Sequence, residues 1–183
     1  MKCPFEQQLD EVVDPQNFGA LLRSAYFLGG SSSEIGARIG VLVCEKNSAP
    51  PSPVVSAASA GALEISEIYS TSNLPRLLNG AKEDGWRILG AAASVPNGMR
   101  NDDGGPVECM DLSDVETGPP TLLVLGSEGS GLRTLVARAC TGFVKIPGSD
   151  AAQIEGGGNA GVDSLNVSVT GGIMLWHLLH DRK

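Results

Sequence analysis

Strand-like and helix-like segments alternate along this chain of 183 residues, and the alternation restricts its fold more than any other feature. Continuous apolar runs such as Arg38–Cys44 (RIGVLVC) and Thr121–Leu125 (TLLVL) are typical of strands buried on both faces. Segments with apolar residues at helical spacing lie between such runs. Because strands that alternate with helices form parallel sheets covered on both sides, we predict an α/β fold with a mostly parallel sheet.

Cap and turn residues set the boundaries of the expected elements. Asp14-Pro15 begins a helix that Gly29-Gly30 ends, and Ser52-Pro53 begins a second helix through VVSAASAGALE. The remaining elements are strands at Ile65–Tyr69, Trp86–Ala92 and Phe143–Ile146, and helices at Asn73–Lys82, Leu132–Ala139 and Leu165–His180.

Two connections are long for a compact domain. Val95–Pro120 is rich in Gly, Pro and Asp, and we expect it to be an exposed connection. Ser149–Val162 is rich in Gly and Ala, with GGGNAG at its centre, and we expect a flexible loop. The second loop is of more interest, because polar, helix-capping residues follow it.

The net charge of −8 is unusual for a protein that binds nucleic acid, since attraction to phosphate normally needs a basic surface. Arg100–Pro120 alone carries six acidic residues, so the rest of the chain has 12 basic and 15 acidic residues. Affinity for RNA would therefore come from a local patch, a dimer partner or a separate domain.

Metal, disulfide and membrane chemistry find little support in the sequence. The four cysteines are far apart and form no CxxC pair, which favours reduced thiols. His177 and His180 lie one helical turn apart, but no further ligands accompany them, and we predict no metal site. No apolar run reaches the ~20 residues that span a bilayer, and MKCPFEQQLDEVVDP has no signal or transit pattern.

Gly126–Arg133 (GSEGSGLR) is the first of three segments with the composition of a ligand site. It follows an apolar strand and precedes a helix, where ligands bind in open parallel sheets. Its glycines let backbone amides approach a ligand closely. A plain glycine-rich turn is the structural alternative.

The other two segments flank predicted helix starts. Asn17 falls in the first turn of its helix, and Arg23 lies six residues further on, so both can line one end of a cleft. A structural salt bridge of Arg23 is the alternative, because an unpaired buried arginine is costly. In SLNVS, Ser164 is placed to cap the last helix, and Asn166 to orient a hydroxyl or a carboxylate, or simply to accompany the cap.

Together these segments resemble the three motifs of the SpoU/TrmH family of SPOUT methyltransferases. The matching stretches are DPQNFGALLRSA (14–25), LLVLGSEGSGLR (122–133) and VKIPG…SLNVSVTGGI (144–173). They occur in the family's order and cover nearly the whole chain. The stretch NSAPPSPVVSAASAGALE (47–64) is similar to the rRNA branch, including the mitochondrial large-subunit rRNA guanosine 2′-O-methyltransferases.

The resemblance implies a single SpoU-type domain over residues 1–183, with helices flanking a parallel sheet and a C-terminal deep trefoil knot. It implies a homodimer that uses S-adenosylmethionine to methylate a ribose 2′-hydroxyl of RNA, without a membrane or a metal. The cofactor residues would be Gly126, Ile146, Pro147, Leu165 and Ser168, and the catalytic residues Asn17, Arg23, Glu128, Ser164 and Asn166. A mitochondrial location would follow from the rRNA branch, with the cytoplasm as the alternative.

The chemistry limits the role of Arg23. The ribose hydroxyl must lose its proton and align with the methyl group, whereas a guanidinium holds its own proton strongly. We therefore expect Arg23 to bind phosphate, orient the hydroxyl and assist electrostatically, with Glu128 positioning either group.

The chain differs from the family pattern at three places. Gly148–Asp163 lengthens the loop expected to wrap the cofactor, and the first strand would have to form from the weakly apolar FEQQLDEVV. The N-terminal RNA-binding domain of many rRNA members is not expected here. The alternatives are a tRNA methyltransferase, a non-catalytic RNA-binding or ribosome-assembly factor with this fold, and a generic nucleotide-binding domain.

Overall fold

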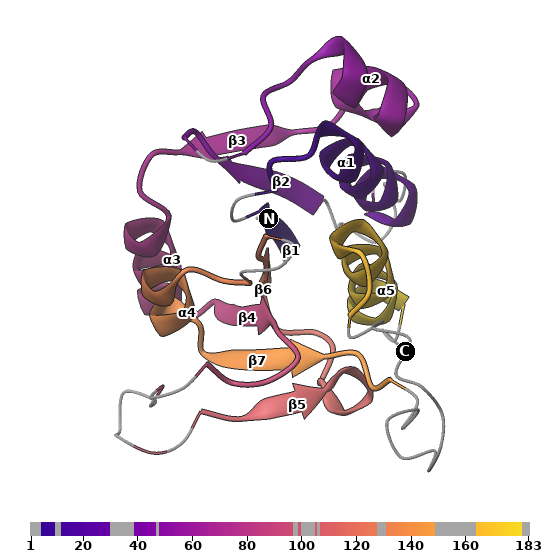
Figure 1. The fold of residues 1–183 in the computed structure, drawn as a ribbon. Helices are drawn as coiled ribbons and strands as arrows, with labels where there is room; N and C mark the ends of the chain where they lie inside the picture. The colour runs from indigo at the N-terminus through magenta and orange to yellow at the C-terminus, as the bar shows by residue number, and fades with distance from the viewer. Residues whose placement is uncertain are drawn as a thin grey trace, which may run out of the picture.

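The computed structural model describes the backbone of residues 5–9 and residues 12–29, 39–46, 48–96, 99, 105, 107–127, 131–148 and 164–180, to which every structural statement below refers. Its centre is a sheet of seven parallel strands in the order β3-β2-β1-β6-β4-β7-β5 (Figure 1). The strands are β1 (Phe5–Leu9), β2 (Ile39–Cys44), β3 (Ile68–Thr71), β4 (Arg87–Ala91), β5 (Cys109–Asp111), β6 (Thr121–Leu125) and β7 (Gly142–Lys145).

Helices cover both faces of this sheet. On one side α1 (Pro15–Gly29) packs against α2 (Pro53–Ser59) and α5 (Val167–His180), and on the other α3 (Leu74–Glu83) packs against α4 (Thr134–Ala139) (Figure 1). Successive side chains of β6 pack on opposite faces of the sheet. Leu123 is part of the hydrophobic core under α1 and α5, and Leu122 is part of the core under α3 and α4. The predicted α/β fold with a parallel sheet is confirmed. No helix in the described part is long and apolar enough to cross a membrane.

Three predicted helix starts are confirmed by their caps. The Asp14 carboxylate accepts from the backbone N–H groups of Gln16 and Asn17 at 3.2 and 3.3 Å. Ser52 and Asn73 cap α2 and α3 in the same way. The predicted VVSAASAGALE helix is shorter than expected, since left-handed backbone at residues 60–61 ends α2 and a 3-10 turn, η1 (Ala62–Glu64), follows.

The expectation that Val95–Pro120 is wholly an exposed connection is wrong. Cys109–Asp111 forms the edge strand β5 beside β7, and the 3-10 turn η2 (Leu112–Asp114) follows it. Leu112 and Val115 are buried. The strand is three residues long and acidic, so its sequence carries no periodic signal, and pairing with β7 creates it.

The weakly apolar first segment does form a strand. β1 lies between β2 and β6 and pairs with both in parallel register. The composition of this segment does not favour a strand, but pairing with a neighbour on each side stabilises it in strand conformation. The Ser149–Val162 loop lies outside the described residues, so the trefoil knot and the effect of the Gly148–Asp163 insert stay predictions.

Candidate active site

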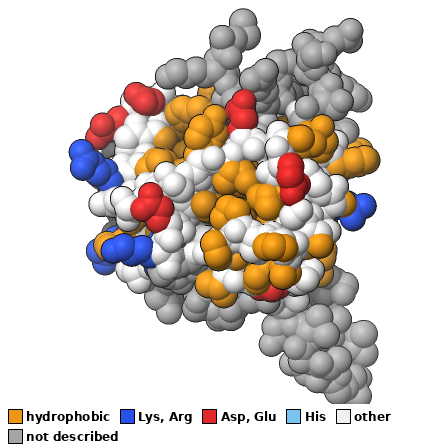
Figure 2. All heavy atoms as spheres, turned by 90° about the horizontal axis from the view of Figure 1, so that it is seen from above, with side chains coloured by type: hydrophobic (Ala, Val, Ile, Leu, Met, Phe, Trp, Pro, Cys, Tyr) orange, Lys and Arg blue, Asp and Glu red, His pale blue; other side chains and the backbone are white. Residues whose placement is uncertain are grey.

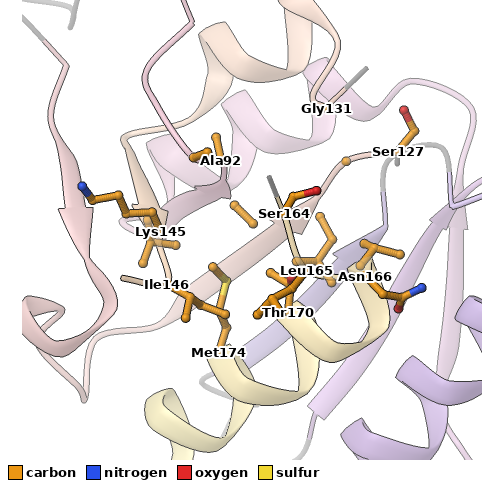
Figure 3. A pocket seen from close by; sticks show the side chains of 16 residues that line it. Ala92, Ser127, Gly131, Lys145, Ile146, Ser164, Leu165, Asn166, Thr170 and Met174 are labelled. Atoms are coloured by element: carbon orange, nitrogen blue, oxygen red, sulfur yellow. The ribbon is translucent and has the colours of Figure 1, made fainter. Parts of the chain in front are cut away.

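A cavity of about 620 Å³ lies at the carboxyl ends of β4, β6 and β7 (Figure 3). Its walls are the segments that follow these strands, together with the first turns of α5 and the residues before it. In open parallel sheets this edge is where ligands bind. The volume is typical of a small-molecule or cofactor site.

Gly126 forms one wall of the cavity and fixes the shape of the turn after β6. Ser127 and Gly131 exchange two backbone hydrogen bonds of 3.2 and 3.1 Å, so the turn closes on itself. A Cβ on Gly126 would lie 2.4 Å from the carbonyl carbon of Gly131, whose φ of 67° is left-handed. Both glycines are therefore required. Glu128 lies outside the described residues, and its catalytic role stays a prediction.

Asn166, and not Ser164, caps the last helix. The Asn166 side-chain oxygen accepts from the backbone N–H of Ser168 at 2.8 Å and from its hydroxyl at 2.6 Å, while Thr170 N–H donates to the Asn166 carbonyl. The expected cap at Ser164 is wrong because α5 begins two residues later than predicted. Ser164 instead lines the cavity beside Leu165 (Figure 3).

The Asn166 amide also joins the two helices that reach the cavity edge. Its Nδ2 donates to Oδ1 of Asn17 at 3.0 Å, which links the first turn of α1 to that of α5. Asn17 is buried, with 7% of its surface exposed, and is not among the cavity-lining residues. The structure thus brings the two asparagines together, but Asn17 does not line the cavity as the sequence had predicted for it.

The predicted cofactor residues divide into two groups. Gly126, Ile146 and Leu165 line the cavity, whereas Pro147 and Ser168 do not, although they directly follow the lining residues Ile146 and Val167. Arg23 also lies away from the cavity wall, on the exposed face of α1.

The sequence model of the SpoU rRNA Methylase family matches residues 8–176. The chain belongs to this family.

Sequence relatives agree with that membership, and a solved structure shares the fold. Mitochondrial rRNA methyltransferase 1 of Schizosaccharomyces pombe is 38% identical over 97% of this chain and 52% of its own length. The 23S rRNA (guanosine-2′-O-)-methyltransferase RlmB of Shewanella oneidensis is 33% identical over 98% of this chain and 61% of its own length. The SpoU methyltransferase AviRb of Streptomyces viridochromogenes, in complex with AdoMet, superposes with a TM-score of 0.71 at 22% identity, over 100% of this chain and 62% of AviRb. The chain thus spans about half to three fifths of the length of these two sequence relatives.

Arg23 lies on an exposed face of α1. Arg23 makes no hydrogen bond or ion pair with another described residue, so the structural salt bridge finds no support there. Phe27 lies one helical turn further along α1, on the same exposed face. Arg23 is therefore available to a partner that covers this face.

The sequence analysis missed the cavity residues that come from β4 and β7. Ala91–Ala93 follow β4, and Lys145 ends β7. Lys145 is the one charged side chain among the described residues that line the cavity. These residues reach the cavity because β4 lies between β6 and β7 in the sheet, and no local sequence pattern reveals that order. The predicted strand end at Ala92 was the one signal in the sequence that pointed to this part of the wall.

A second polar cluster lies at the opposite edge of the SpoU sheet and is structural. The Arg87 guanidinium donates to the Thr121 hydroxyl at 3.1 and 2.9 Å and to the Glu116 carbonyl at 2.8 Å. Burial lowers the pKa of Arg87, while the nearby Glu116 acts in the opposite direction. These bonds join the amino ends of β4 and β6, away from the cavity.

Three cysteines, Cys44, Cys109 and Cys140, are not in disulfides, and no group of three potential metal ligands occurs among the described residues.

The Asn166 cap leads to a comparison with Ser164. Asn166→Ala removes a helix cap, and we expect it to lower the free energy of unfolding by about 1–2 kcal/mol. Ser164→Ala is the matched control, because Ser164 is exposed and caps nothing; it should change stability by less than about 0.5 kcal/mol. Urea unfolding followed by circular dichroism measures both. Equal losses for the two variants would contradict the assignment of the cap.

Proposed function

We propose that this chain is an S-adenosylmethionine-dependent methyltransferase that acts on a ribose 2′-hydroxyl of RNA, at a guanosine of large-subunit rRNA. The observation that carries the proposal is the cavity at the carboxyl edge of the sheet, which is built from the second and third SpoU motifs. The names of the relatives, an rRNA methyltransferase and a guanosine-2′-O-methyltransferase, support the substrate.

The residues that line the cavity fit this cofactor. Leu125, Ile146 and Leu165 provide apolar walls for an adenosyl group and a thioether chain. The close approach of Gly126 to Gly131 leaves this part of the wall without side chains, so a bound molecule can lie directly against the backbone. When bound, S-adenosylmethionine supplies a methyl group that is already activated by its positively charged sulfur.

The chain's own residues then have to position and deprotonate the ribose hydroxyl. Ser164 and Asn166, at the cavity edge, are placed to orient the ribose or the cofactor (Figure 3). Asn17 fixes the rotamer of Asn166 through their hydrogen bond. Glu128 would position the hydroxyl or Arg23. Arg23, which keeps its proton, would bind phosphate and assist electrostatically.

The active protein is proposed to be a homodimer that pairs through α1 and α5. Phe27 (82% exposed), Ile173 (38%) and Trp176 (54%) line a groove between these helices, together with Ser24, Leu28 and Gly172. Side chains this apolar, gathered in one exposed groove, mark an interaction site. A second copy is the occupant that closes a symmetric interface with the same patch on both subunits. A partner subunit in this groove would cover Phe27 and would therefore also lie close to Arg23. Arg23 does not line the cavity of its own subunit.

RNA recruitment also favours a partner surface or a separate region. In the face shown in Figure 2, hydrophobic side chains gather in several patches, while the visible Lys and Arg side chains lie towards its margins. This face is not a basic platform of the kind that binds phosphate. Arg23, the one described Lys or Arg side chain on α1 and α5, is exposed beside the proposed interface and is better placed for that role.

Arg23→Ala is expected to abolish methyl transfer while it changes cofactor affinity by no more than a few-fold, because the cavity does not contain Arg23. Transfer of a labelled methyl group to rRNA measures activity, and calorimetry measures the affinity for S-adenosylmethionine. Arg138→Ala is the control, since Arg138 is exposed on α4 across the sheet. Activity of Arg23→Ala close to that of the unaltered protein would refute the role.

Trp176→Glu is expected to shift the protein from dimer to monomer, because a carboxylate in an apolar interface loses its hydration without a partner. Leu135→Glu places the same charge on an apolar side chain that is 64% exposed on α4, and should leave the dimer intact. Sedimentation velocity over a range of protein concentrations distinguishes the two. A monomeric unaltered protein, or dimers in both variants, would exclude this interface.

The compartment is proposed to be the mitochondrion, on the basis of the mitochondrial relative. Loss of the protein should then remove a 2′-O-methyl group from mitochondrial large-subunit rRNA and leave cytosolic rRNA and tRNA unchanged. Mapping of 2′-O-methylation across all three RNA pools, in cells with and without the gene, tests this. A lost site in tRNA would reassign the substrate, and an unchanged map would favour a non-catalytic factor.

A further inference from the structure

Lys145 and Asp111 form an ion pair at the rim of the cavity. They are register partners on the neighbouring strands β7 and β5, and the Lys145 Nζ lies 3.2 Å from the Asp111 Oδ1. That oxygen is buried and accepts no hydrogen bond from another described residue, so the ammonium is its counterion there. The two side chains are 43% and 39% exposed, and the pair favours a position of the Lys145 ammonium beside β5.

The geometry of the pair directs the charge away from the cavity. The aliphatic part of Lys145 contributes to the cavity wall, while Figure 3 shows its nitrogen pointing away from Ile146 and Met174. Cys109, on the same edge strand, adds no charge at neutral pH, because burial raises the pKa of its thiol. The bound molecule is thus presented with methylene groups and not with an ammonium.

The charge of the cofactor makes this arrangement consequential. S-adenosylmethionine carries a sulfonium, an ammonium and a carboxylate, and so has a net charge of about +1, whereas the product S-adenosylhomocysteine has none. An ammonium free to enter the cavity would repel the first molecule and not the second. A loose Lys145 would therefore favour retention of the product.

We propose that Asp111 is a positioning residue that holds the Lys145 ammonium outside the cavity and so preserves the affinity for S-adenosylmethionine relative to S-adenosylhomocysteine. The inference rests on the proposed function, in that it requires the cofactor to bind in this cavity.

The test compares the two ligands by calorimetry on the whole chain. Asp111→Asn should weaken S-adenosylmethionine binding about three- to tenfold at low salt, by the repulsion of two unit charges in a partly solvated site. It should change S-adenosylhomocysteine binding less than about twofold, and the difference should shrink in higher salt. Asp114→Asn removes an equal charge from an exposed position of η2 and should alter neither affinity.

Two further variants separate charge placement from stability of the edge strand. Asp111→Glu keeps the counterion and should keep the affinity ratio. Asp111→Asn combined with Lys145→Met removes the charge but retains an apolar stem, and should restore the ratio. If Asp111→Asn weakens both ligands equally, or the double variant does not restore the ratio, the inference is overturned. If the unaltered protein binds neither ligand, the proposed function itself fails.

Discussion

The parallel pairing of β6 with β1 on one side and β4 on the other determines where everything else in this molecule can lie. Because all strands run in the same direction, their carboxyl ends meet at one edge. The Gly126 turn, the residues after β4 and the end of β7 converge there. Three stretches that are far apart in the sequence thereby share one cavity. The polar cluster around Arg87 lies at the opposite edge of the sheet and joins strands there.

The hydrogen bond between Asn17 and Asn166 adds the helices to this arrangement. It ties the first turn of α1 to that of α5, so the two helices that carry the exposed apolar groove are fixed relative to the cavity. The helices that carry the groove are thus also the helices that carry Asn17 and the cavity-edge residue Asn166.

Most of the fold was predictable from the sequence because strong local signals agreed. The strand at Thr121–Leu125 and the caps at Asp14, Ser52 and Asn73 appear in the structure as predicted. One failure depended on non-local contacts, since β5 forms because β7 offers it a hydrogen-bonding edge. The other was a shift of a helix boundary: α5 begins at Val167, two residues later than predicted, and Asn166 is therefore its cap in place of Ser164.

Less of the site than of the fold was predictable from the sequence, because part of the site also depends on contacts between segments that are distant in the sequence. Motif resemblance located Gly126, Ile146, Ser164, Leu165 and Asn166 at the cavity edge, all of which the structure brings together. It did not reveal Lys145, because the importance of that side chain depends on Asp111 in a strand that could not be predicted. A motif cannot predict an interaction that depends on which residue lies opposite on the neighbouring strand.

Charge explains how an acidic chain can serve both of its proposed ligands. A cofactor with a positive sulfur favours a cavity without free cations, and the single described cation at its wall is paired with a carboxylate. RNA needs the opposite: cations on an exposed surface, free to meet phosphate. Arg23, which is proposed to bind phosphate, is exposed and has no ion pair among the described residues. Under the proposed function, a net charge of −8 therefore does not conflict with RNA binding as long as the exposed cations lie on the face that the RNA approaches.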